Sequence, residues 1–173
     1  MSLELPPSAP MTTLFATETP PQWLAFAKRR PRGIASKAET VVLRSAHVDR
    51  ARELAAIGRR AYGNDRPGAD HWDDEPPFID GVQTPGFDCE NLALWVRRTM
   101  AVEFDDWPLG CGRPTICRLQ NQMVHCVLIV VTPDGDYAIG ALPHEDFVPW
   151  ATLEGYRWLC RLHAEDEWRG ILP

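Results

Sequence analysis

The sequence predicts an α+β fold in which a central helix packs on an antiparallel sheet. Three observations support this: apolar residues at helical spacing in the first part of the chain, alternating or continuous apolar runs later, and a Pro-Asp-Gly turn that joins two of those runs. Helices that come first and hairpin-joined strands that follow are typical of α+β domains. With 173 residues the chain is long enough to bury one sizeable core.

Three helices are expected. The first opens at Pro20-Pro21, where a proline loses no needed hydrogen bond, and stops before Pro31. The second covers 46–62, where apolar residues recur at helical spacing and charged residues lie mostly on the other side. The third covers 88–103 and is apolar over most of its surface, which predicts a central position.

The predicted strands follow the helices. They cover 115–119, 123–131, 137–142 and 156–163, and the second is apolar at positions of both parities, so both of its faces should be covered. A two-residue loop at Asp134-Gly135 would make a hairpin of the two middle strands and bring Gly140 opposite Ile129.

The domain organisation is expected to be simple. Residues 1–19 are rich in proline and are predicted to form an extended tail outside the core, and residues 20–173 to form a single domain. The segment from residue 64 to residue 87 lacks periodicity, with Trp72 and Phe78 as expected anchors; such long connections are often functional. The natural start, Met1 or Met11, stays open.

Charge and hydropathy exclude several function classes. The 24 acidic residues outnumber the 18 basic ones, and a net charge of -6 argues against non-specific binding to nucleic acid or to an anionic membrane. No apolar run approaches the roughly 20 residues of a membrane span. The first 20 residues lack the basic start and apolar stretch of a signal peptide, so a place in the cytoplasm or in a larger particle such as a virion is expected.

The cysteines narrow the chemistry. Five is an odd number, and without a secretory signal reduced thiols are expected, so no disulfide is predicted. Neither a Cys-x-x-Cys pair nor a His-Glu-x-x-His motif occurs, which argues against zinc. Four cysteines lie in predicted strands or beside a loop rich in glycine and proline and are expected to be bystanders: Cys111, Cys117, Cys126 and Cys160.

Cys89 is the strongest candidate nucleophile because it opens the central helix. The unpaired N–H groups of a helix start lower the pKa of a thiol and favour the thiolate. Asp88 and Glu90 act in the opposite direction, since nearby negative charge disfavours a thiolate. A purely structural cysteine, with these acids capping the helix, is the alternative interpretation.

His125 is the candidate base. It lies inside an apolar strand, where an imidazole without a partner is costly. A strand packed on the central helix can bring it to Cys89, and cysteine hydrolases use a histidine to remove the thiol proton. The alternative is a core histidine whose ring is satisfied by a backbone carbonyl.

The order of these motifs resembles the bacterial transglutaminase-like cysteine proteinases. A Gly-Asp-Cys-Glu-Asp-Tyr-Ala-like segment of that family corresponds to Phe87–Ala93, and its His-Ala-Val-Leu-like strand and Gly-Asp turn correspond to His125–Leu128 and Gly135-Asp136. A later block of the family is similar to Val148–Trp150 and Gly155–Trp158. The resemblance covers roughly residues 20 to 162 and implies a papain-like or transglutaminase-like fold.

The resemblance implies Cys89 as nucleophile and His125 as base. The family's third residue, an aspartate on the return strand, falls on Gly140, so the orienting acid is missing. In the serine-protease triad a lost acid costs roughly 10⁴-fold in rate. Three acids are candidate substitutes, although none stands at the matching position: Asp136, Glu145 and Asp146.

No cofactor or metal is expected, with calcium as the alternative. In one periplasmic branch of the family the acids around the cysteine bind calcium. Here Asp88 and Glu90 are retained, Asn91 replaces an aspartate, and Val124 replaces a further acid. An asparagine oxygen can still ligate a hard cation.

Two functions remain open at this point. The first is a cysteine peptidase or amidase that acts on a protein or peptide substrate. The second is a catalytically retired domain of the same fold, kept as a binding or structural module in a larger assembly such as a phage particle. Cys89 and His125 favour the first; the missing acid and the bulky Phe87, where the family has glycine, favour the second.

Overall fold

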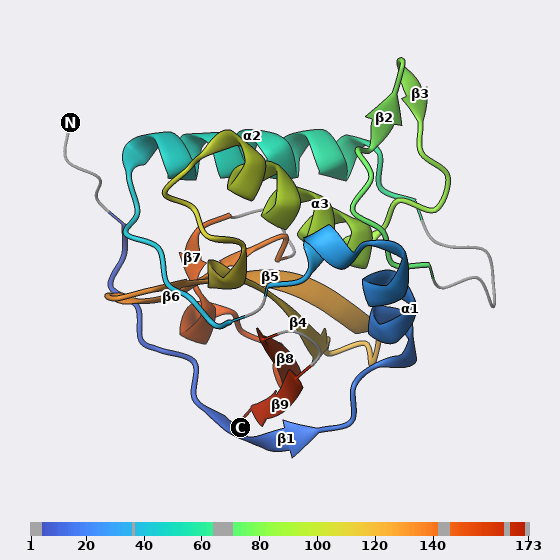
Figure 1. Cartoon of the computed structure of the whole chain (residues 1–173). Coiled ribbons are helices and arrows are strands. Elements are labelled where there is room, and N and C mark those ends of the chain that lie inside the picture. Colours follow the sequence, from blue (N-terminus) through green and yellow to red (C-terminus); the bar gives the residue numbers. More distant parts are fainter. Residues whose placement is uncertain (1–4, 36, 64–70, 142–145, 165–166, 172–173) are drawn as a thin grey trace.

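The computed structural model describes residues 5–35, 37–63, 71–141, 146–164 and 167–171. In these residues three α-helices pack against a seven-stranded antiparallel sheet, which confirms the predicted α+β class (Figure 1). None of the described helices has the length and apolar character needed to cross a membrane.

The three predicted helices are all present. They are α1 (Pro21–Arg29), α2 (Ser45–Arg60) and α3 (Cys89–Glu103). Three short 3₁₀ helices accompany them: η1 (Pro31–Gly33), η2 (Leu109–Cys111) and η3 (Trp150–Thr152). The α3 helix is buried along most of its length, as its apolar surface predicts.

The large sheet has the strand order β1-β9-β8-β4-β5-β6-β7, and every neighbouring pair is antiparallel. Its strands in chain order are β1 (Thr13–Thr17), β4 (Gly112–Arg118), β5 (Val124–Thr132), β6 (Gly135–Ile139), β7 (Val148–Pro149), β8 (Arg157–Ala164) and β9 (Glu167–Ile171). A separate hairpin comprises β2 (Phe78–Ile79) and β3 (Val82–Gln83). The sequence patterns did not predict β1, β7, β9 or this hairpin.

The β5 strand has both faces covered, as predicted. Cys126, Leu128 and Val130 belong to the core shared with α2 and α3. Val127 and Ile129, at the alternate positions, pack on the other side with Met11, Cys117 and the chain around η3. This burial on two sides explains why β5 is a continuous apolar run rather than an alternating one.

The predicted register of the β5–β6 hairpin is wrong by two residues. Thr132 pairs with Gly135, so the two-residue turn is Pro133-Asp134, and Ile129 pairs with Ala138 rather than with Gly140. The Thr132 side chain explains the difference: its Oγ1 donates to the Gly135 carbonyl at 2.6 Å and accepts from the Asp134 N–H at 3.2 Å. These bonds close the loop one residue earlier.

The N-terminal segment is extended but does not form a tail outside the core. Met11 is only 3% exposed, and β1 pairs with β9 at the edge of the sheet. Ahead of it the chain crosses the β5–β6 turn, where the Asp136 N–H donates to the Ala9 carbonyl at 3.1 Å and the Tyr137 hydroxyl donates to the Pro6 carbonyl at 3.0 Å. We call residues 5–12 the N-terminal strap. The prolines predict an extended segment, and the backbone carbonyls of this extended strap accept hydrogen bonds from the sheet.

The long connection before α3 is partly ordered by packing. Trp72 is buried, as expected of an anchor, with Trp168 and Trp23 nearby in one cluster. Phe78 is not an anchor: it is 38% exposed on the β2–β3 hairpin, which projects from the body of the molecule (Figure 1). The part of this connection from residue 64 to residue 70 lies outside the described residues.

Candidate active site

The candidate site lies where the N-terminus of α3 meets the edge of β5. The β6 strand pairs with β5 only up to Leu128↔Ile139, because Gly140, at φ +83°, turns the chain away. A positive φ of this size favours glycine. The edge of β5 ahead of Leu128 is therefore free of β6, and there the Cys126 N–H donates to the Cys89 Sγ at 3.4 Å. The thiol thus touches the residue next to His125.

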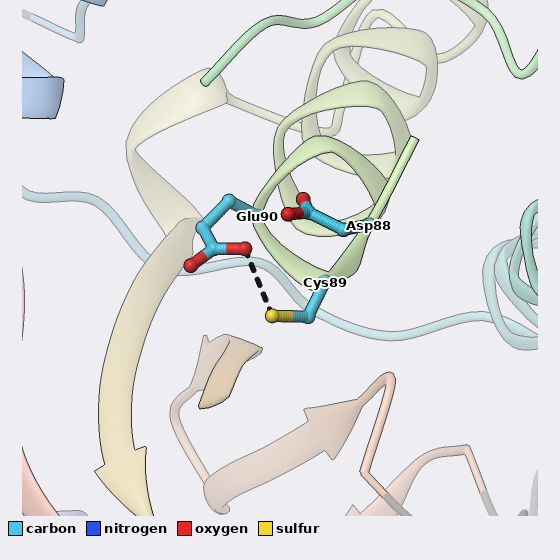
Figure 2. A group of neighbouring side chains, drawn as sticks. All are labelled: Asp88, Cys89 and Glu90. Atoms are coloured by element: carbon cyan, nitrogen blue, oxygen red, sulfur yellow. Dashed lines mark hydrogen bonds between the residues drawn. The ribbon is translucent and has the colours of Figure 1, made fainter. Parts of the chain in front are cut away.

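The Cys89 thiol itself donates to the Glu90 carboxylate, with 2.9 Å between Sγ and Oε2 (Figure 2). Burial of the thiol and the negative charge of Glu90 raise the pKa of Cys89 well above its ordinary value, and Asp88 adds to this. The Cys126 N–H acts in the opposite direction. Of the two opposing influences that the sequence indicates, the helix start is therefore the weaker, and Cys89 is a protonated thiol at neutral pH.

His125 is 3% exposed, and its Nε2 lies 3.1 Å from the Gly140 carbonyl oxygen. A carbonyl can only accept, so Nε2 carries the proton and Nδ1 keeps its lone pair. Burial lowers the pKa of His125, although the Gly140 carbonyl and the Glu90 charge partly oppose this. The ring is thus neutral at pH 7, and one of its nitrogens is satisfied by a backbone carbonyl, as the alternative of a core histidine predicts.

None of the candidate substitute acids that the structure describes contacts the His125 ring directly. Asp136 accepts from Arg161 at 2.6 Å and from the Met11 N–H at 2.9 Å, at the far end of β6 from Gly140, so it holds the strap rather than His125. Asp146 accepts from the Gly140 N–H at 2.8 Å and reaches His125 only through that residue. Glu145 lies outside the described residues.

Tyr62, just beyond α2, is a site residue that the sequence did not reveal. Its hydroxyl interacts with the Cys89 thiol, and its pKa is raised by burial and by Cys89, Asp88 and Glu90. Nothing in the spacing of the chain points to it, since its contact with Cys89 depends on how α2 packs on α3.

Asp88, Cys89 and Glu90 form the one cluster of possible metal ligands found among the described residues, with ligand atoms within 4.8 Å of one another. Calcium takes about six to eight oxygen ligands, and this cluster supplies two carboxylates and a thiol. The Asn91 Oδ1 already accepts from the Asp73 N–H at 3.2 Å. As arranged, these residues do not supply the oxygen ligands that calcium takes.

Comparisons with known proteins bear on the fold. No family model matches the sequence, and no curated protein matches it. Among solved structures, LapG of Legionella pneumophila aligns with a TM-score of 0.55 and 19% identity over 71% of this chain and 68% of that one. The fold is transglutaminase-like.

Two further LapG structures give the same result. The EGTA-treated and calcium-bound forms each align with a TM-score of 0.51 and 19% identity, over 72% of this chain and 73% and 74% of theirs, respectively. At this identity the transglutaminase-like fold is what the likeness shows, and the roles of individual residues depend on the geometry described above.

Proposed function

We propose that this protein is a cysteine hydrolase, a peptidase or amidase, with Cys89 as nucleophile and His125 as base. One observation carries the proposal: the strand residue after His125 contacts the Cys89 sulfur, while the Gly140 carbonyl holds the His125 Nε2–H. This leaves Nδ1 as the free nitrogen of the ring. A nucleophile at a helix start, a base on the adjacent strand and a group that orients the base are the parts such catalysis requires.

The proposed reaction begins when His125 Nδ1 takes the proton of the Cys89 thiol. The thiolate attacks the carbonyl carbon of a peptide or amide, and N–H groups at the start of α3 stabilise the oxyanion. The imidazolium then protonates the leaving amine, which gives a thioester on Cys89. Water, deprotonated by the same Nδ1, hydrolyses the thioester and restores the thiol.

The Gly140 carbonyl performs part of the work of the missing acid. It fixes the tautomer of His125, but it carries no full negative charge with which to stabilise the imidazolium. The loss of both effects in a serine protease costs roughly 10⁴-fold. We therefore expect a slow hydrolase rather than an inert one.

The second candidate, a retired domain that binds a partner protein, is favoured by a different observation. The Cys89 thiol is bonded to Glu90 and has a raised pKa, and Phe87 is fully buried against Trp95 where the family has glycine. A protonated, hydrogen-bonded thiol beside a packed aromatic core is what a structural cysteine in a non-catalytic domain requires.

Alkylation of Cys89 by iodoacetamide, resolved by peptide mass spectrometry across pH, separates the two. A hydrolase should show a rate that depends on His125, so His125→Gln changes the Cys89 profile while Cys160 in the same sample is unaffected. Turnover of a peptide library, in calcium and in EGTA, should be lost in Cys89→Ser. Identical alkylation profiles together with no turnover in either buffer would establish the retired domain.

A further inference from the structure

The orientation of His125 depends on a residue that is itself held from outside the sheet. Gly140 ends β6 at φ +83°, and its carbonyl receives the His125 Nε2–H at 3.1 Å. A glycine is the least restrained of residues, so its carbonyl keeps one direction only where neighbouring groups fix it. The chain just beyond, at Ala141, leaves the sheet.

Asp146 supplies that restraint. Its Oδ1 accepts from the Gly140 N–H at 2.8 Å, and its Oδ2 accepts from Arg59 Nη2 at 2.7 Å. Its backbone carbonyl accepts from Arg52 Nε at 3.3 Å. Asp146 is only 6% exposed, and the Arg59 charge offsets the cost of burying the carboxylate. Both arginines belong to α2, which packs on the helix that carries Cys89.

We infer that Asp146, held by Arg59, is a positioning residue that sets the tautomer of His125 through Gly140. This rests on the proposed function, in which His125 Nδ1 is the base. The acid expected on the return strand is replaced by a backbone carbonyl, and a carboxylate six residues further along the chain keeps that carbonyl in place. The α2 helix thereby connects both parts of the site: it packs on α3, which carries Cys89, and its Arg59 holds the Asp146 that positions Gly140 beside His125.

The link is geometric rather than electronic. The N–H that Asp146 binds and the carbonyl that His125 binds belong to the two different peptide groups of Gly140, joined at its Cα. Asp146 therefore fixes the backbone torsions of Gly140 instead of polarising one amide. A residue that acts only by geometry can be replaced in part by another oxygen acceptor of the same shape, even one without a charge.

The test uses nuclear magnetic resonance of isotope-labelled histidine, with His125 assigned from the His125→Gln variant. In the wild type the Nε2–H tautomer should dominate. In Asp146→Ala its excess over the Nδ1–H tautomer should fall roughly fivefold, the size expected for one ordinary hydrogen bond. Asp146→Asn keeps an oxygen acceptor for the Gly140 N–H but turns its amide N–H groups toward Arg59, so its change should be smaller than that of Asp146→Ala and similar to that of Arg59→Gln. The pH profile of Cys89 alkylation should change more in the alanine variant than in the asparagine variant.

Asp136→Ala is the matched control, because Asp136 is equally buried and also paired with an arginine, but at the strap. It should lower stability and leave the His125 ratio unchanged. An unchanged ratio in Asp146→Ala, or the same change in Asp136→Ala, would overturn the inference. If Asp146→Ala does not fold, Arg59→Gln decides: a smaller change in the same direction supports the inference and an unchanged ratio overturns it.

The two readouts keep this inference separate from the proposed function. The tautomer ratio reports whether Asp146 holds His125. The dependence of Cys89 alkylation on His125 reports whether that histidine serves the thiol. If the tautomer ratio changes in Asp146→Ala but Cys89 alkylation does not depend on His125, the proposed hydrolase is rejected. The inference that Asp146 positions His125 then still stands.

Discussion

Two opposing influences act on the Cys89 thiol at the first residue of α3. The helix start and the Cys126 N–H favour a thiolate, whereas burial and two neighbouring carboxylates favour the thiol. Burial is the largest of these influences on the pKa of Cys89, and the charge of Glu90 and its hydrogen bond to the thiol raise the pKa further. Glu90 is therefore the residue whose charge most directly holds Cys89 in its protonated form.

The variant Glu90→Gln should lower the pKa of Cys89, because it removes the nearest negative charge and leaves an amide in its place. Each unit by which the pKa falls gives roughly a tenfold larger thiolate fraction at a pH below it. Alkylation of Cys89 between about pH 7 and pH 8 should accelerate accordingly. Glu18→Gln, an exposed acid just after the edge strand β1, is the control and should leave the rate unchanged. Equal rates in all three proteins would contradict a dominant role for Glu90.

The residues of the site differ in how far the sequence predicts them. The position of Cys89 at a helix start follows from local periodicity, and the approach of β5 follows from its apolar run. The direction of the Glu90 side chain and the contact of Tyr62 do not, because both depend on rotamers and on packing between helices. The helix start alone predicts a lowered thiol pKa, whereas burial and the Glu90 side chain raise it.

At the scale of elements, Gly58 sets how closely α2 and α3 approach. A methyl group added at this position would lie 2.3 Å from Leu92 Cδ1 and 3.3 Å from Phe87 Cε1. Leu92 in turn lies beside Gly140, with its Cδ2 3.5 Å from where a Gly140 side chain would begin. The same close approach that packs the helices therefore supports the turn that holds His125.

The substitution Gly58→Ala should destabilise the protein although alanine is the better helix former. Helix propensity alone would give a gain of about 1 kcal/mol. Overpacking costs about 1–3 kcal/mol and should outweigh it, so the urea midpoint should fall. Ala56→Gly on the exposed side of α2 is the control and should lose only about 1 kcal/mol. A higher midpoint for Gly58→Ala would show that Leu92 moves aside without cost.

The hairpin of β5 and β6 shows why an element can be predicted and its register missed. The turn residues between Thr132 and Asp136 allow two adjacent two-residue loops, and the apolar pattern of the strands fits both, since a shift of two residues keeps every side chain on its face. The hydroxyl of Thr132 selects one of them. Side-chain bonds of this kind are not visible in a hydropathy pattern.

At the scale of the whole molecule, the N-terminal strap closes one end of the sheet. Arg161 and Asp136 form a buried pair there, and Met11 bonds to both, with its N–H to Asp136 and its carbonyl to Arg161 Nη2 at 3.0 Å. A methyl group at Gly135 would lie 2.5 Å from the backbone of Ser8, which shows how tightly the strap crosses the turn. The segment is therefore part of the domain's packing.

Deletion of residues 1–12 should lower the free energy of unfolding by more than Met11→Ala does. The alanine variant loses a buried side chain, at about 2–5 kcal/mol, whereas the deletion also removes the partners of a buried ion pair. Urea unfolding measures both. Cys89 alkylation in the folded deletion variant should match the wild type, since the strap crosses the opposite end of β6. Equal stability of the deletion variant and the full chain would show that the strap contributes no net packing energy.

Two histidines, the buried His125 and the half-buried His163, should make the stability of the protein fall at acid pH. Burial lowers the pKa of His125, and the pKa of His163 is also lowered, by burial and by Arg169. Below the ordinary histidine pKa of about 6.5, these side chains are protonated in the unfolded chain but still neutral in the folded protein. The unfolded state therefore binds more protons, and the free energy of unfolding decreases as the pH falls.

The free energy of unfolding should therefore decline between about pH 7 and pH 5, with a slope of at most about 1.4 kcal/mol per pH unit for each such histidine. His125→Gln removes one of these contributions, so its urea midpoint should fall less steeply with pH than that of the wild type. Comparison of slopes cancels carboxyl groups shared by both proteins, including Asp74, whose raised pKa acts in the opposite direction. His163→Gln should flatten the limb less, because His163 is less buried than His125. Parallel slopes in the wild type and His125→Gln would mean that His125 titrates equally in the folded and unfolded chains.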